Sequence, residues 1–94
     1  MKPLTGIRIL DFTTLLPGPL ATLMLSDAGA EVIKIEKIGG EEMRKSEPRI
    51  FDNSILFAML NRWKKSIEVN LKNPVYLEKI KKLIKKSDVI IEQF

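Results

Sequence analysis

The sequence contains neither cysteine nor histidine among its 94 residues. Without cysteine the chain has no disulfide bond and no thiolate nucleophile. Without histidine it lacks the usual general base near neutral pH and the commonest metal ligand. No apolar run approaches the ~20 residues of a membrane-spanning helix, and the first residues lack the apolar stretch of a signal peptide. We therefore expect a cytoplasmic protein with no membrane contact and no metal site.

The remaining composition is typical of a soluble globular protein, with 45% hydrophobic and 30% charged residues. A chain of this length forms one domain at most, so residues 1–94 are treated as one unit. Positive charge gathers in the second half: residues 51–94 carry nine basic and five acidic side chains, whereas residues 1–50 carry seven of each. This excess suits an anionic partner, such as a phosphorylated ligand or a nucleic acid, but a solvated lysine-rich helix face explains it equally well.

Hydrophobic periodicity predicts an alternation of strands and helices. The expected strands lie at residues 7–12, 31–36, 66–70 and from 89 onward. The expected helices lie at residues 20–28, 55–60 and 75–86. This order predicts an α/β fold in which parallel strands are joined by right-handed crossovers. Residues 37–53 contain Gly39, Gly40 and Pro48 together with many charges, and they are expected to form a long loop.

The same patterns predict which faces are buried. In residues 31–36, charged and apolar side chains alternate, which predicts a strand with one wetter face. In the first helix, Leu20, Leu23 and Met24 share one face, which we expect to be buried. Asn73 and Pro74 predict the start of the last helix, as N-cap and first-turn residue.

The loop after the first strand is a candidate binding segment. It lacks the Gly-x-Gly-x-x-Gly fingerprint, so the sequence does not support nicotinamide binding. A loop that leaves a parallel strand and opens a helix nevertheless points free N–H groups outward, and anions bind there. A plain strand-to-helix turn is the simpler interpretation of residues 13–19.

A second candidate is the basic segment at residues 61–66. Its cations, Arg62, Lys64 and Lys65, flank the aromatic ring of Trp63, and such a group could hold phosphates beside a stacked adenine. The alternative is a solvated strand entry, which is the commoner role of such charge runs. The acidic residues show no paired spacing for acid–base catalysis and no cluster for metal binding.

Taken in order, several segments resemble the opening of the family III CoA-transferases, the group that includes formyl-CoA transferase, the carnitine CoA-transferases and α-methylacyl-CoA racemase. The matching segments are residues 4–12, 16–22, 27–36, 61–67 and 87–94, together with Gly40-Glu41 and Arg44. The resemblance implies an N-terminal Rossmann-like unit that binds CoA, here a partial domain of about four parallel strands with flanking helices. It also implies homodimers for the full-length proteins.

The resemblance also implies a set of CoA-binding residues. These are Leu16, Pro17 and Gly18 in the first loop, Lys37, Lys64 and Lys65 near the nucleotide, and Gln93 and Phe94 along the CoA channel. At Lys65 the family more often has arginine, so bidentate phosphate binding is lost there.

The resemblance implies no catalytic residue within this chain. In the transferases, an aspartate downstream of this region attacks the acyl-CoA thioester, and no counterpart precedes Phe94. The racemase branch uses histidine, which is absent here. We therefore expect an N-terminal fragment of a family III CoA-transferase that is inactive alone. The alternatives are a racemase-type fragment, a stand-alone CoA- or nucleotide-binding module and, last, a nucleic-acid-binding domain.

Overall fold

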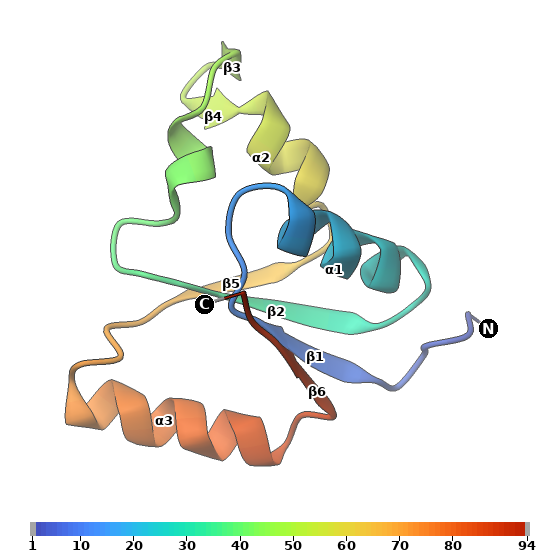
Figure 1. Ribbon diagram of the computed structural model, residues 1–94, viewed down its shortest axis with the longest axis vertical. Helices are drawn as coiled ribbons and strands as arrows, with labels where there is room; N and C mark the ends of the chain where they lie inside the picture. The colour runs from blue at the N-terminus through green and yellow to red at the C-terminus, as the bar shows by residue number, and fades with distance from the viewer. Residues whose placement is uncertain (1, 94) are drawn as a thin grey trace.

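Four parallel strands form the central sheet of the computed structural model, which describes residues 2–93 (Figure 1). The strand order is β5-β2-β1-β6. The strands of this sheet are β1 (Arg8–Asp11), β2 (Glu31–Glu36), β5 (Lys65–Glu68) and β6 (Val89–Ile91). Helices α1 (Pro17–Asp27) and α3 (Pro74–Lys85) cover opposite faces of the sheet, and α2 (Ile55–Leu60) lies beside α1. The predicted parallel α/β fold is confirmed.

Alternation along the strands divides the hydrophobic core between the two faces of the sheet. On the α3 face, Leu10 of β1 packs with residues of β2 and with Ile80 of α3. On the α1 face, the neighbouring Ile9 packs with Val32, and Leu25 of α1 lies against them. The pairing of Ile9 with Val32 and of Leu10 with Ile33 keeps each set of side chains on its own face.

Local signals in the sequence explain where the helices begin. Asn73 caps α3, because its side-chain oxygen accepts a hydrogen bond from the backbone N–H of Val75 at 2.9 Å. Ser54 caps α2 in the same way by accepting from Phe57 N. Helix α1 starts at Pro17, a few residues earlier than predicted, because proline suits the first turn of a helix.

The predicted loop at residues 37–53 is partly regular, which corrects the sequence-based expectation. It contains a short 3₁₀ helix, η1 (Glu42–Lys45), and the strand β3 (Arg49–Ile50), which pairs with β4 (Asn53–Ser54). Elements of two to four residues are too short to show a hydrophobic period, so periodicity could not predict them. Together with α2 they fold over the α1 side of the sheet (Figure 1).

Two predictions about buried faces are wrong, for a shared reason. Leu20 and Met24 of α1 are exposed, whereas Leu23, the third residue of the predicted face, is buried together with the polar Thr22. In β2, the side that was expected to be wet is buried, because α1 and residues 37–54 cover it. Both elements bring polar groups into the interior, where these groups pair with one another.

Candidate functional site

A cavity of about 310 Å³ opens at the carboxyl end of the central sheet. The loops that leave β1, β2 and β5 form its wall. Its lining residues are Phe12, Thr14, Leu15, Ile35, Glu36, Lys37, Glu41, Glu42, Val69 and Leu71. Ligands of open α/β sheets bind at this edge, because the strand-to-helix loops gather there. The cavity is thus the first candidate for a binding site.

The loop after β1 is held in an unusual conformation beside this cavity. Leu15 has a backbone φ of 65°, a left-handed conformation that a leucine adopts only where its surroundings enforce it. Gly18 lies so close to Thr13 and Gln93 that a Cβ atom at this position would overlap both side chains. The Gln93 amide donates a hydrogen bond to the Thr14 carbonyl oxygen at 2.9 Å. These contacts join the end of β6 to the predicted binding loop.

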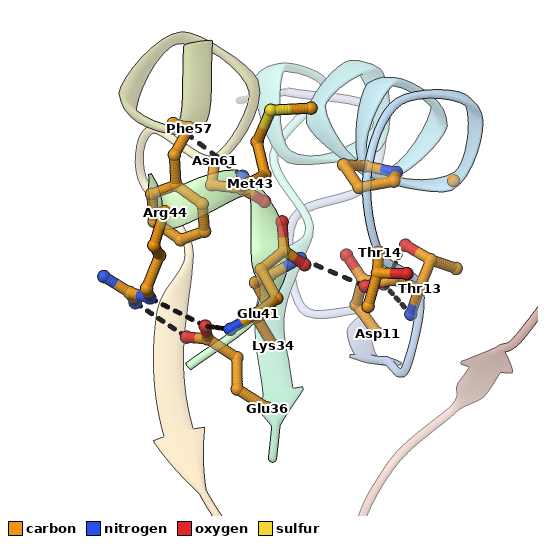
Figure 2. A network of polar contacts seen from close by, with 12 residues as sticks. Asp11, Thr13, Thr14, Lys34, Glu36, Glu41, Met43, Arg44, Phe57 and Asn61 are labelled. Atoms are coloured by element: carbon orange, nitrogen blue, oxygen red, sulfur yellow. Dashed lines mark hydrogen bonds and ion pairs between the residues drawn. The ribbon is translucent and has the colours of Figure 1, made fainter. Parts of the chain in front are cut away.

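A cluster of buried charges lies next to the cavity, on the α1 side of the sheet (Figure 2). Its acidic members are Asp11, Glu36 and Glu41, whose exposed fractions are 2% or less. Lys34, Lys64 and Arg44 supply the compensating positive charges. Equal numbers of the two signs allow the cluster to be buried, because an unpaired buried charge is strongly unfavourable.

Asp11 organises the inner part of the cluster. Its Oδ1 accepts hydrogen bonds from the backbone and hydroxyl of Thr13, and its Oδ2 accepts from the Thr22 hydroxyl at 2.6 Å. Lys64 Nζ lies 3.4 Å from Oδ2 and donates to Pro19 O at 3.0 Å and Asn61 Oδ1 at 2.8 Å. Burial lowers the pKa of Lys64, and Asp11 opposes that shift. This arrangement fixes the first turn of α1 against the sheet.

Glu36 organises the outer part, through a two-point contact with Arg44. Arg44 Nε and Nη2 donate to Oε1 and Oε2 of Glu36, each at 2.7 Å, and Ser66 and the backbone N–H of Glu41 also donate to this carboxylate. Burial raises the pKa of Glu36, but these hydrogen bonds outweigh it and hold the pKa at about 2. The Arg44 guanidinium also stacks 4.0 Å from the ring centre of Phe57. Glu36 is therefore charged at neutral pH, where it holds η1 directly and α2 through the contact of Arg44 with Phe57.

Lys34 and Glu41 form the most deeply buried ion pair. Lys34 Nζ lies 2.8 Å from Glu41 Oε2, and each side chain is 1% exposed. The ammonium also donates to the backbone oxygen of Thr13 at 3.1 Å. Glu41 Oε1 has no hydrogen-bond partner. One lysine thus joins three segments: β2, the loop after β1 and the segment that leads into η1.

The structure brings together several of the residues that the sequence analysis selected. Leu16, Pro17 and Gly18 form the start of α1, and Gln93 lies against this turn. Lys37 lines the cavity and is exposed, with its ammonium 2.5 Å from Glu42 Oε1. That contact holds the pKa of Glu42 below its usual value. A phosphate bound by Lys37 would compete with Glu42 for the ammonium.

The other selected residues lie elsewhere. The amino group of Lys64 is enclosed by Asp11, Pro19 and Asn61 and is turned away from solvent. Lys65 begins β5, at the opposite end of that strand from the cavity, and its ammonium lies 3.5 Å from the Glu31 carboxylate. Phe94 lies outside the described residues. CoA contacts by these three residues stay predictions.

Sequence reasoning missed the buried charges as a unit. Alternation along residues 31–36 predicts that Lys34 and Glu36 lie on a wetter strand face. Glu41 and Arg44 enter the sequence analysis only as part of the resemblance. The available signal was their spacing: Lys34 and Glu36 are two apart on one strand, so their side chains share a face with Val32, which is buried. Strand periodicity cannot show what covers that face, so the pairing became visible only in the fold.

Comparison with known proteins decides the family. The family model described as CoA-transferase family III matches residues 4–94. The chain belongs to this family. It is 47% identical over 96 residues to succinyl-CoA:glutarate CoA-transferase from Mus musculus. It is 44% identical over 95 residues to formyl-CoA:oxalate CoA-transferase from Bradyrhizobium diazoefficiens. These alignments cover 100% and 99% of this chain but only 22% of either relative, so the chain spans less than a quarter of their length.

Solved structures of similar proteins have the same fold. The crystal structure of Rv3272 from Mycobacterium tuberculosis superposes with a TM-score of 0.92 at 42% identity, and covers all of this chain with 26% of its own. A CAIB/BAIF family protein from Brucella suis gives a TM-score of 0.91 at 31% identity, over 99% of this chain and 26% of its own. Across residues 2–93 the model shows no helix of the length and hydropathy needed to span a bilayer. In the same residues no three acidic side chains gather as metal ligands.

Proposed function

We propose that this chain is the CoA-binding N-terminal part of a CoA-transferase. The supporting observation is the cavity at the carboxyl end of β1, β2 and β5, with an apolar wall and Lys37 at its rim. The apolar wall suits the pantetheine chain or the adenine ring, and the exposed ammonium suits a phosphate. A volume of about 310 Å³ encloses one part of CoA, so the remainder would lie along the surface of the loop at residues 14–18.

For a longer polypeptide that contains the remaining three quarters of its relatives' length, we propose CoA transfer between an acyl-CoA and a carboxylic acid. The two relatives described above are named for this reaction. The resemblance implies that the nucleophile is an aspartate beyond residue 94. We therefore expect the 94-residue chain to bind CoA but to give no transfer above a heat-denatured control. A racemase-type protein remains the alternative, because both branches share this N-terminal unit.

Calorimetric titration of the 94-residue chain with CoA tests the binding proposal, with ADP and duplex DNA as competing ligands. The informative variant is Lys37→Met, because it removes the positive charge at the rim and keeps the aliphatic stem. Its matched control is Lys79→Met on α3, an equally exposed lysine on the other face of the sheet. We expect CoA affinity to fall in the first variant and to stay unchanged in the second.

The same pair of variants separates the CoA proposal from nucleic-acid binding. Basic residues of α3 lie along its exposed side, away from the cavity. If α3 bound a nucleic acid, DNA would bind with a steep salt dependence and Lys79→Met would weaken it. DNA binding that is tighter than CoA binding, together with a loss in the Lys79 variant, would contradict the CoA proposal.

A further inference from the structure

The segment from residue 37 to 46 and the loop from 12 to 16 both contribute lining residues to the cavity. Lys34 is the residue that links them. Its ammonium contacts Glu41 in the first segment and the Thr13 carbonyl oxygen in the second. Thr14, next to Thr13, and Glu42, next to Glu41, are both lining residues. The relative position of the two walls is therefore set at Lys34.

A buried ion pair at this place is not explained by stability alone. Taking two charges out of water costs more than their attraction often returns, and apolar residues of similar size frequently serve a core better. Here the cost is increased by Glu41 Oε1, which has no hydrogen-bond partner although the side chain is buried. An ion pair differs from apolar packing in one respect: it fixes which groups meet and in which direction.

The other contacts between residues 37–46 and the sheet do not link this segment to the loop after β1. The Glu36 carboxylate accepts hydrogen bonds from Arg44 and from the backbone N–H of Glu41. These contacts attach the segment to β2, but none of them reaches the loop after β1. The exposed contact between Lys37 and Glu42 lies within the segment itself. Across the described residues, the side chain of Lys34 makes polar contacts with both cavity walls.

We propose that Lys34 and Glu41 are positioning residues that hold the two walls of the cavity at the separation required for ligand binding. The ammonium contacts both Thr13 and Glu41, and thereby sets the separation of the neighbouring residues Thr14 and Glu42, which line the cavity. Lys34 does not line the cavity, and the side chain of Glu41, which does, is only 1% exposed, so we assign the pair a positioning role and no contact with the ligand. The identity of that ligand as CoA rests on the proposed function, whereas the positioning role concerns the free chain and can be tested without CoA.

The test uses the double variant Lys34→Met with Glu41→Met. It removes both charges together, so that no unpaired charge is left buried, and it keeps unbranched side chains of similar length. A matched single variant, Glu41→Gln, keeps the shape but leaves Lys34 without its counter-ion. Glu47→Gln is the control, because it makes the same chemical change at an exposed position of the same region.

Amide hydrogen exchange of the free 94-residue chain is the first readout. In the double variant we expect exchange at Gly40, Glu41 and Arg44 to rise at least about tenfold. Exchange in the centre of the sheet, at Leu10 and Ile33, and the melting temperature should stay as in the parent. Glu47→Gln should exchange as the parent does at all five amides. Parent-like exchange at Gly40, Glu41 and Arg44 in the double variant would overturn the positioning role.

Calorimetric titration with CoA is the second readout. We expect the double variant to bind CoA about tenfold more weakly although its fold is intact, which a purely structural pair would not produce. Faster exchange with unchanged CoA affinity would overturn the claim that these walls form the ligand site. If the parent chain binds no CoA, the proposed function fails for this chain, and the exchange experiment alone decides the positioning role.

Discussion

Asp11 and Lys64 are 53 positions apart in the sequence, yet Lys64 Nζ lies 3.4 Å from Asp11 Oδ2 in a site that water does not reach. The contact connects the end of β1 with the residue before β5, and through Pro19 it reaches the first turn of α1. The lysine that the resemblance assigns to CoA thus has its donors occupied within the protein. Removal of the Lys64 ammonium should therefore lower the stability of the fold, and it should change CoA affinity only indirectly, through the loop after β1.

Replacement of Lys64 by methionine should therefore destabilise the chain. The variant leaves the buried Asp11 carboxylate without its cation, and breaking one partner of a buried pair costs about 3 kcal/mol. The hydrogen bonds from Thr13 and Thr22 to Asp11 persist, so we expect a loss near the lower end of the range of about 3–5 kcal/mol for a broken buried ion pair. Urea denaturation measures it. Lys65→Met, at an exposed position, is the control and should change the free energy of unfolding by less than about 0.5 kcal/mol.

The pH dependence of stability should reveal Glu36. Its pKa is about 2 in the folded chain, below the ordinary value of 4.5. A carboxylate with a lowered pKa stabilises the fold fully above its unfolded pKa, and the contribution disappears as the pH falls through the folded value. We expect stability to decrease between pH 4.5 and about 2, by up to about 3 kcal/mol from this group.

The variant Glu36→Gln isolates that contribution. Denaturation midpoints measured at several pH values should show a shallower acid decline in the variant than in the parent. A decline of equal slope in the two proteins would show that the acid sensitivity comes from other carboxylates.

Replacement of Glu42 by glutamine should strengthen CoA binding. Glu42 competes with a phosphate for the Lys37 ammonium, which it contacts at 2.5 Å on the surface. Removal of this competitor leaves Lys37 free, and we expect a gain of about twofold to fivefold, the range that an exposed ion pair spans. The gain should shrink at high salt, because exposed charges are screened. Calorimetric titration at two salt concentrations checks this, and weaker binding by the variant would count against Lys37 as a phosphate ligand.

Substitution of Gly18 by alanine should disturb the loop after β1. The added Cβ would overlap the Thr13 side chain, which is buried and has no space to move. We expect a loss of about 1–3 kcal/mol in the free energy of unfolding, as for other overpacked sites. Leu16→Ala, at an exposed neighbouring position, is the control. Equal stability of the two variants would show that the loop yields more easily than the contacts indicate.

The order of strands and helices could be predicted from the sequence because each signal is local. The caps at Ser54 and Asn73 and the apolar strands of the sheet depend on residues within one or two turns. The resemblance then supplied the family. The structure places Gln93 against the loop after β1, where its amide donates to the Thr14 carbonyl oxygen, and its contact with CoA stays a prediction.

The buried charges could not be predicted in the same way. Whether Lys34 and Glu36 face water depends on what folds over β2, and much of the cover comes from residues 37–54, whose short elements show no hydrophobic period. For the same reason Lys64 and Lys65, adjacent in sequence, have opposite environments: one is enclosed by Asp11 and Asn61, and the other is exposed beside Glu31. Strand alternation turns neighbouring side chains to opposite faces, but tertiary contacts decide which face is buried.

The most direct measurement is calorimetric titration of CoA into the parent chain and into Lys37→Met, with ADP as a second ligand. The account predicts that CoA binds the folded parent more tightly than ADP does, because the cavity contributes apolar contacts beyond the phosphates. It also predicts weaker CoA binding by the variant. Absence of CoA binding by a chain that circular dichroism shows to be folded, or equal affinity of parent and variant, would contradict it.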